Sequence, residues 1–301
     1  MVDALPAGGD NTVPASIPLH GSNVHVRPRA LVQTLRLYAL TSLVLGHGTP
    51  ALAQESPITL FELSGSLSVV ERADRAYWGG DAVESLRLAE GLLANTPNDV
   101  DARWRAARAS VALGIIATGE ELENHWYRHA IVHAGEALRL DSTNVEVKRW
   151  AVASKGQLAL QTGPLETSRL AKEIWDMSHE LLERDPDDGF AHHALGVLHF
   201  EVMNLSRVKR LLGRLFLGGD ALGKASWDDA VFHHERAVAL EPTSVAFRVG
   251  FAKTLQRRDR VLEAIEQLQS ATSLPSVHPG DPDYRGQARR RLDVLLAEGN
   301  G

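Results

Sequence analysis

Hydrophobic residues recur every three or four positions from Ile58 to the C-terminus, which is the spacing of one face of an α-helix. Alternating polar and β-branched residues, the pattern of a half-buried strand, are lacking. Two apolar stripes illustrate the helical spacing, one with Leu86, Leu88, Ala89, Leu92 and Leu93, the other with Ala130, Ala134, Ala137, Leu138 and Leu140. The pattern predicts an all-α protein.

The predicted helices stop at short segments of similar composition. These segments are LLANTPND at Pro97, ALRLDSTN at Ser142, LLERDPDD at Pro186 and AVALEPTS at Pro242. Proline cannot continue a helix, and clusters of Asp, Ser and Asn favour the start of the next one. The recurrence of these stops is an internal repeat.

The length of the repeat indicates the architecture. Successive stops lie 45, 44 and 56 residues apart, and a further stop at Ser276 follows after 34 residues. Thirty-four residues is the length of a tetratricopeptide unit. In the pair Leu195-Gly196, the glycine allows a neighbouring helix to approach closely. We therefore predict a tetratricopeptide-like α-solenoid of antiparallel helical hairpins over residues 54–301, with longer helices or loops in the earlier units and a concave face for a ligand.

Residues 1–53 have a different composition. Three arginines between positions 27 and 36 precede a largely apolar ten-residue segment, and an Ala-Leu-Ala sequence follows and ends at Ala53. This order is typical of a secretory signal peptide, and ten residues are too few to cross a bilayer. We expect cleavage after Ala53 and a periplasmic or secreted protein, and we interpret the residues before about Val26 as an upstream extension.

Composition and charge exclude several classes of protein. The chain has 301 residues, a net charge of −6 and no cysteine. The negative charge argues against nucleic-acid binding through bulk positive charge. Without cysteine there are no disulfides, thiolate metal sites or thiol nucleophiles.

An insertion at about 203–225 lengthens the hairpin between Pro186 and Pro242. On a helical wheel, its apolar residues share one face and its arginines lie on the opposite face. The apolar residues are Leu205, Val208, Leu211, Leu212, Leu215 and Phe216, and the arginines are Arg207, Arg210 and Arg214. We predict an amphipathic helix, followed by a turn at Gly218-Gly219. Its apolar face could fill the groove as core, cover an apolar ligand, lie on an anionic membrane surface, or bind a protein partner.

The same segment resembles a known family. The run from His192 to Pro242, SLPSVHPGDPDYRGQARRRLDVL after it and NTPNDVDARWRAARAS before it are similar to the regulator of microtubule dynamics family. The family features are a Leu-Gly-x-x-His/Trp helix, a basic cluster, a glycine pair and an Ala-Ser helix start. Here these are Leu195, Gly196, His199, Arg207, Arg210, Gly218, Gly219, Ala225 and Ser226. The resemblance covers roughly Leu86 to Leu296.

This resemblance implies a tetratricopeptide-like fold with a ligand-binding groove. Animal members of the family are linked to microtubules and to membrane contact sites, and the repeat domain of one of them binds lipid. An exported protein would meet no microtubules, so the fold and the groove are what the resemblance implies for this chain.

Histidines form a second candidate feature. Glu121, His125, His129 and His133 are spaced four residues apart and share one helix face, and two imidazoles one turn apart can hold a metal ion. The His-Glu-x-x-His pattern of zinc proteases is absent. We therefore interpret the stripe mainly as a polar face and predict no metal ligands. The adjacent pairs at 192–193 and 233–234 are interpreted as packing positions.

Motifs for catalysis or cofactor binding are missing from the sequence. There is no Gly-x-Ser-x-Gly, no Gly-x4-Gly-Lys-Ser/Thr and no Gly-x-Gly-x-x-Gly after a strand. The acidic segments 185–188 and 281–283 sit where carboxylates cap a following helix. The sequence thus predicts no catalytic residues and no cofactor.

Together these features predict a non-catalytic, exported binding protein. In the main interpretation, the concave groove binds a protein or peptide partner, and nucleic acid is not a ligand. The alternative is a carrier of a lipid or another apolar ligand, with residues 205–222 as its lid, and an enzyme or metal protein that uses the histidine stripe is a third. The predicted binding residues are Arg207, Arg210, Arg214, Leu211, Leu215, Phe216, Gly218, Gly219 and His199.

Overall fold

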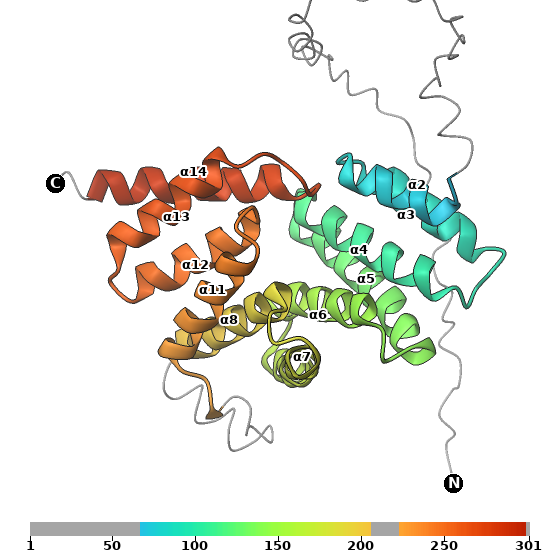
Figure 1. Ribbon diagram of the computed structural model, residues 1–301, viewed down its shortest axis with the longest axis horizontal. Helices are drawn as coiled ribbons and strands as arrows, with labels where there is room; N and C mark the ends of the chain where they lie inside the picture. Colours follow the sequence, from blue (N-terminus) through green and yellow to red (C-terminus); the bar gives the residue numbers. More distant parts are fainter. Residues whose placement is uncertain (1–66, 206–222, 299–301) are drawn as a thin grey trace, which may run out of the picture. The chain divides into compact units, whose positions relative to one another are not determined.

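The computed structural model describes residues 67–205 and 223–298, and the regular secondary structure in these ranges is entirely α-helical (Figure 1). This confirms the all-α prediction. The helices are α2 (Val69–Trp78), α3 (Ala82–Leu93), α4 (Val100–Ile116), α5 (Glu120–Leu140), α6 (Val145–Ala159), α7 (Pro164–Arg184), α8 (Gly189–Asn204), α11 (Trp227–Leu240), α12 (Val245–Arg257), α13 (Val261–Ser273) and α14 (Asp281–Glu298).

Two predicted segments lie outside the described residues. They are the signal peptide with its upstream extension, residues 1–53, and most of the amphipathic insertion, residues 206–222. Both stay predictions.

Consecutive helices pair into hairpins: α2 with α3, α4 with α5, α6 with α7, α8 with α11, and α12 with α13, followed by α14. The predicted stops at Pro97, Ser142, Pro186 and Pro242 each lie in a short turn between two hairpins, and Ser276 lies between α13 and α14. The internal repeat is confirmed as a repeat of helical hairpins.

Each of the first four stops also begins the next hairpin. The residue two positions after each stop is the N-cap of the following helix. Its side chain accepts a hydrogen bond from a backbone N–H in the first turn of that helix. These N-cap residues are Asp99, Asn144, Asp188 and Ser244. Such a cap satisfies an N–H group that has no partner within the helix. One short motif therefore ends a hairpin and starts the next.

The acidic segment 281–283 differs from this prediction, because it is the first turn of α14 itself. The carboxylate of Asp281 accepts the N–H groups of Val277 and His278, at 2.7 and 2.8 Å, instead of capping the helix that follows. It ties down the loop that leads into α14, because two consecutive backbone donors point at one buried acceptor.

The earlier units are longer because their second helices are longer. Both α5 and α7 have 21 residues, whereas α13 in the 34-residue unit has 13. The predicted lengthening thus falls mainly on the helices, not on the connecting turns.

Small residues let the helices pack closely. Ala102, Ala106 and Ala109 of α4 are fully buried in the N-terminal core. A side chain at Gly114 would meet the ring of Tyr127, and one at Gly196 would meet the ring of His234. The predicted close approach at Gly196 is therefore present, between α8 and α11.

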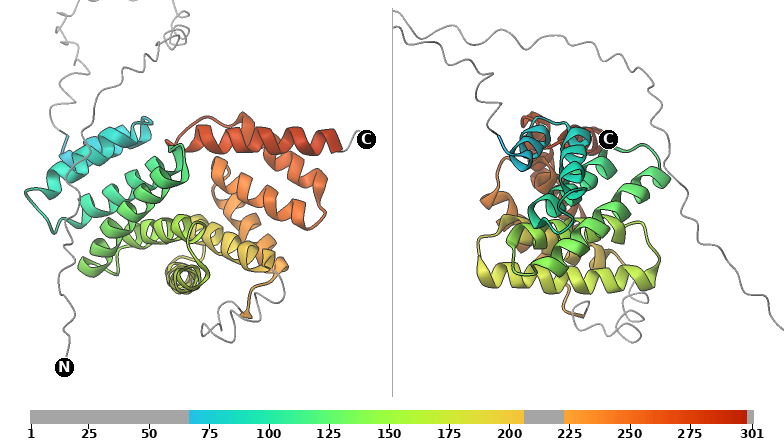
Figure 2. Two further views of the ribbon diagram at one scale, coloured as in Figure 1. Left: turned by 180° about the vertical axis from the view of Figure 1, so that it is seen from behind. Right: turned by 90° about the vertical axis from the view of Figure 1, so that its right-hand side faces the viewer.

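The chain from His278 to Tyr284 packs against the helices of the first three hairpins (Figure 2). The ring of His278 lies 4.9 Å from that of Trp78 in α2. The amide of Gln157 in α6 donates to the hydroxyl of Tyr284 at 3.5 Å. A Cβ added to Gly280 would meet Ile115 at the end of α4. Residues distant in the sequence thus share one surface.

In the described ranges, none of the helices combines the length and the hydropathy needed to cross a bilayer.

Changing Gly196 to alanine should destabilise the protein. The new Cβ would lie 2.8 Å from the ring of His234, which is itself buried. We expect a loss of about 1–3 kcal/mol in the free energy of unfolding, the usual cost of overpacking. Gly135→Ala in α5 is the matched control, because that site is open and exposed, and it should gain about 0.5–1 kcal/mol. Urea unfolding of both variants measures this, and an unchanged Gly196→Ala midpoint would contradict the packing described.

Candidate functional site

The first helices of the hairpins form a continuous layer. Successive first helices contact one another, α2 with α4, α4 with α6, α6 with α8, α8 with α12, and α12 with α14, whereas the second helices contact mainly first helices. In a solenoid, the layer whose helices approach each other more closely is on the concave side. We call α2, α4, α6, α8, α12 and α14 the inner layer, and α3, α5, α7, α11 and α13 the outer layer.

The two layers differ in charge. Within the inner layer, α4, α6 and α12 each carry three Lys or Arg residues, against one, one and no Asp or Glu. Every helix of the outer layer has more Asp and Glu than Lys and Arg. The acidic residues against the basic ones are two against one in α3, four against two in α5, five against three in α7, three against one in α11, and two against none in α13. The other inner helices are not basic, because α2 and α14 carry equal numbers of basic and acidic residues and α8 has one acidic and no basic residue. Over all its helices, the inner layer still has more basic than acidic residues, and the outer layer has more acidic than basic residues.

Many inner-layer cations already have a partner within the protein. Lys148 and Lys155 of α6 form ion pairs with Glu180 and Glu173 of α7. Arg149 of α6 forms one with Asp188, at 2.9 Å. These pairs hold the layers together, because each joins two helices, and they leave little free charge on α6.

A second paired group lies at the N-terminal end of the inner layer. Arg105 and Arg108 of α4 both donate to Asp74 of α2, at 2.7 and 2.6 Å. The guanidinium carbon of Arg108 lies 4.1 Å from the ring centroid of Tyr77, a cation–π distance. Burial raises the pKa of Asp74, but the two arginines outweigh burial and lower it overall. Since Arg108 is itself buried, this group is structural.

The C-terminal part of the inner layer carries charge without an ion pair. Lys253 of α12 and Glu201 of α8 are partly buried and influence each other electrostatically, yet neither forms an ion pair with any described residue. Burial and the nearby Arg291 of α14 lower the pKa of Lys253, while Glu201 opposes the shift. Burial raises the pKa of Glu201.

Histidines fill the contact between α8 and α11. His192 and His233 share a hydrogen bond between their Nδ1 atoms at 2.9 Å, and the rings of His193 and His234 lie 5.4 Å apart. Burial lowers the pKa of His193 to about 3 and that of His233 to about 4. These rings are therefore neutral at pH 7, and their interpretation as packing residues agrees with the structure.

Among the predicted binding residues, His199 is the one within the described part of the chain. It is buried in α8, and its Nδ1 accepts the backbone N–H of Ser226, the N-cap of α11, at 3.2 Å. This hydrogen bond joins α8, which precedes the insertion, to the start of α11, which follows it. The other predicted residues lie outside the described ranges and stay predictions: Arg207, Arg210, Arg214, Leu211, Leu215, Phe216, Gly218 and Gly219.

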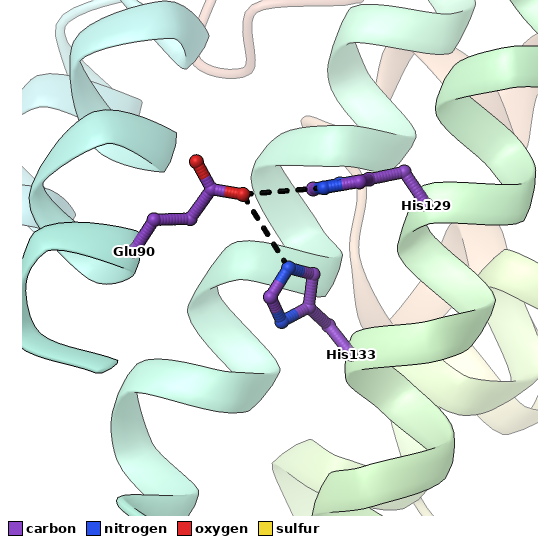
Figure 3. Close-up of side chains that lie close together, drawn as sticks. All are labelled: Glu90, His129 and His133. Carbon is purple, nitrogen blue, oxygen red and sulfur yellow. Dashed lines mark ion pairs between the residues drawn. The ribbon is translucent and has the colours of Figure 1, made fainter. Parts of the chain in front are cut away.

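The histidine stripe of α5 meets a carboxylate that the sequence analysis missed. The Nε2 atoms of His129 and His133 lie 3.2 and 3.5 Å from Oε1 of Glu90 in α3 (Figure 3). His125 lies beside His129 but is exposed, and neither it nor Glu121 belongs to this group. Hydrogen bonds from the two histidines lower the pKa of Glu90 to about 2, so the carboxylate is ionised.

The fold and the layers define the class of protein, a tetratricopeptide-like α-solenoid. The family model described as regulator of microtubule dynamics protein 1-3 matches residues 69–296. The chain therefore belongs to this family, and the resemblance noted from its sequence is confirmed.

One solved structure, with a TM-score above 0.5, supports the fold. A thermophilic tetratricopeptide protein of Thermus thermophilus, TTC0263, is 18% identical with a TM-score of 0.53, over 76% of this chain and 97% of its own. MamA AMB-1 is 17% identical with a TM-score of 0.38, over 69% and 96%. Human IFIT1 with PPP-AAAA is 18% identical with a TM-score of 0.40, and the match covers 72% of this chain and 54% of the IFIT1 chain. No curated protein matches the chain.

The buried histidines should make the protein less stable in mild acid. The folded pKa values of about 3 for His193 and about 4 for His233 lie below the ordinary value of about 6.5. The unfolded chain then binds more protons than the folded chain between about pH 6.5 and pH 4, so the free energy of unfolding falls as the pH falls through this window.

Urea unfolding at about pH 7 and about pH 5 tests this expectation. The midpoint should be lower at the acidic pH, and His233→Gln should reduce the difference between the two midpoints, because one of the responsible groups is gone. Equal midpoints for the unchanged protein would show that these rings are not held neutral.

Proposed function

We propose that this chain is a non-catalytic scaffold that binds an acidic segment of a polypeptide partner on its inner layer, around Lys253. Family membership and fold support a protein-interaction role, because helical-repeat proteins bind partners along an extended concave surface. The observation that carries the choice of an acidic segment is the charge of α12, which has three basic residues and no acidic one.

The state of Lys253 supports this location. A partly buried ammonium group without an ion pair costs free energy in the unbound protein. A carboxylate of a partner beside Lys253 and Arg291 would offset this cost and form a charge-assisted hydrogen bond. Glu201 lies close enough to influence Lys253 electrostatically, and its carboxylate would repel a second anion and attract a cation or a backbone N–H.

Other basic groups of the inner layer are less suitable. Arg105, Arg108, Lys148 and Lys155 each form an ion pair within the protein, and an incoming anion would have to displace a carboxylate that is already held. Arg248 donates to the carbonyl of Pro242 and to Gln267. Lys253 has no such competitor among the described residues.

Export of the protein is part of the proposal and is supported by the sequence of residues 1–53. The expected result is a mature chain that starts at Gln54 in the exported fraction of cells that produce the protein. N-terminal sequencing after fractionation measures this. A full-length N-terminus in the cytoplasmic fraction would contradict export and would leave the binding proposal untouched.

The lipid-carrier alternative depends on residues 205–222. Most of them lie outside the described ranges, and no described contact favours an apolar ligand. We therefore propose the polypeptide partner alone.

A peptide selection tests the binding proposal. Random peptides displayed on phage are selected against the full chain, and the affinity of the enriched peptides is measured by fluorescence polarisation. We expect enrichment of Asp and Glu and affinity that falls with added salt. Lys253→Glu should weaken binding by about 30-fold or more, because disruption of a partly buried charge pair costs about 2–5 kcal/mol.

Two variants serve as controls. Lys172→Glu makes the same charge reversal on the exposed face of α7 in the outer layer, and it should leave the affinity unchanged. Lys253→Met should lose binding while its thermal midpoint stays equal or rises, since it removes a buried charge that has no ion pair. Enriched peptides that lack acidic residues, or that bind the two charge reversals equally well, would contradict the proposal.

A further inference from the structure

The group formed by Glu90, His129 and His133 has the donor atoms of a metal site. Each residue offers one ligand atom, and the three atoms all lie within 4.8 Å of one another. His129 and His133 are one turn apart in α5 and reach the same point, while Glu90 comes from α3 (Figure 3). Two imidazoles and one carboxylate are a common set of protein ligands for zinc, in sites that leave a fourth position open.

The spacing of the donor atoms fits a tetrahedral ion. With metal–ligand bonds of about 2.0–2.2 Å, neighbouring ligand atoms of a tetrahedron lie about 3.3–3.6 Å apart. The distances from Glu90 Oε1 to the two Nε2 atoms are 3.2 and 3.5 Å. These two distances fit a tetrahedral ion, and the two Nε2 atoms lie within 4.8 Å of each other, so an ion could bind after the histidine rings move toward each other.

The far side of His129 is prepared for a ligand at Nε2. Its Nδ1 lies 3.0 Å from Oγ of Ser110, a buried residue whose hydroxyl donates to the carbonyl of Ala106 at 2.8 Å. Because that hydroxyl proton is already used, Oγ accepts the Nδ1–H of His129. This hydrogen bond orients the ring with Nε2 toward Oε1 of Glu90, 3.2 Å away, so a metal ion that takes the place of the Nε2 proton would meet a ring that is already positioned.

The hydrogen bond between Arg103 and His133 opposes metal binding. Nη1 of Arg103 lies 3.3 Å from Nδ1 of His133, and a guanidinium can only donate. Without a metal, the proton of this ring is therefore on Nε2 and points at Glu90. Metal binding transfers that proton to Nδ1, and Arg103 must turn away, although its other two donors stay on the carbonyl of Pro97. Arg103 thus competes with the metal.

Access for an ion and a fourth ligand is available on the outside of this group. The side chain of Glu90 is 44% exposed and that of His129 is 31% exposed, whereas His133 is buried at 9%. A water molecule or a group of a partner can reach the open position from the Glu90 side.

We propose that Glu90, His129 and His133 form a binding site for one zinc ion, which joins α3 to α5 and keeps its fourth coordination position open to solvent. The site lies on two helices of the outer layer and is independent of the proposed peptide site at Lys253. It would add a cross-link between the first two hairpins, since zinc binding that favours the folded state stabilises it.

Zinc titration of the chelator-treated full chain tests the site, with a chromophoric chelator as competitor. We expect one tightly bound zinc ion per chain. Glu90→Gln and His133→Ala should each weaken its binding by about 100-fold or more. His125→Ala is the matched control, because this exposed histidine of the same helix is outside the group, and it should leave the affinity unchanged.

A second variant and a second ion keep the test independent of misfolding. Arg103→Gln should tighten zinc binding, because the competing donor to His133 is removed, and a gain of affinity cannot come from unfolding. Co²⁺ bound in place of zinc should give the intense visible absorption of a tetrahedral ion. Zinc affinity equal in Glu90→Gln, His133→Ala and the unchanged chain, or an unchanged affinity in Arg103→Gln together with octahedral Co²⁺ spectra, would overturn the proposal.

Discussion

Close packing between consecutive helices is the constraint on which the rest of this structure depends. Where α8 meets α11, the absence of a side chain at Gly196 admits the buried ring of His234, and where α4 meets α5, Gly114 does the same for Tyr127. These close contacts between the two helices of a hairpin determine the orientation in which its first helix packs against the next hairpin. The inner layer, which includes the basic helix α12, is the result.

The separation of charge between the layers has both a structural and a functional side. Ion pairs such as Lys155 with Glu173 join an inner helix to an outer one and use up most of the charge on α6. At α12 the acidic partners are missing, and Lys253 lies partly buried without an ion pair to any described residue. Ionisable groups in such perturbed surroundings gather at binding sites. This contrast, more than the fold itself, distinguishes one part of the inner layer from the others.

The sequence predicted local features better than distant contacts. The stops at Pro97 and Pro186 and the close approach at Gly196 follow from the conformational limits of single residues, so they could be found from spacing alone. The site of Glu90 with His129 and His133 could not, because Glu90 lies on another helix and only the stacking of hairpins brings it to α5. Likewise, the periodicity holds no information about the contact of His278 with Trp78, which joins the segment before α14 to the end of α2.

Hydrogen exchange of the full chain, measured with and without a saturating acidic peptide, tests whether an acidic polypeptide binds the inner layer around Lys253. We expect slower exchange in α8, α12 and α14 and unchanged exchange in the outer helices α5 and α7, since bound segments shield the amides of the elements that they contact or stabilise. Protection confined to α5 and α7, or no protection at saturation, would contradict it.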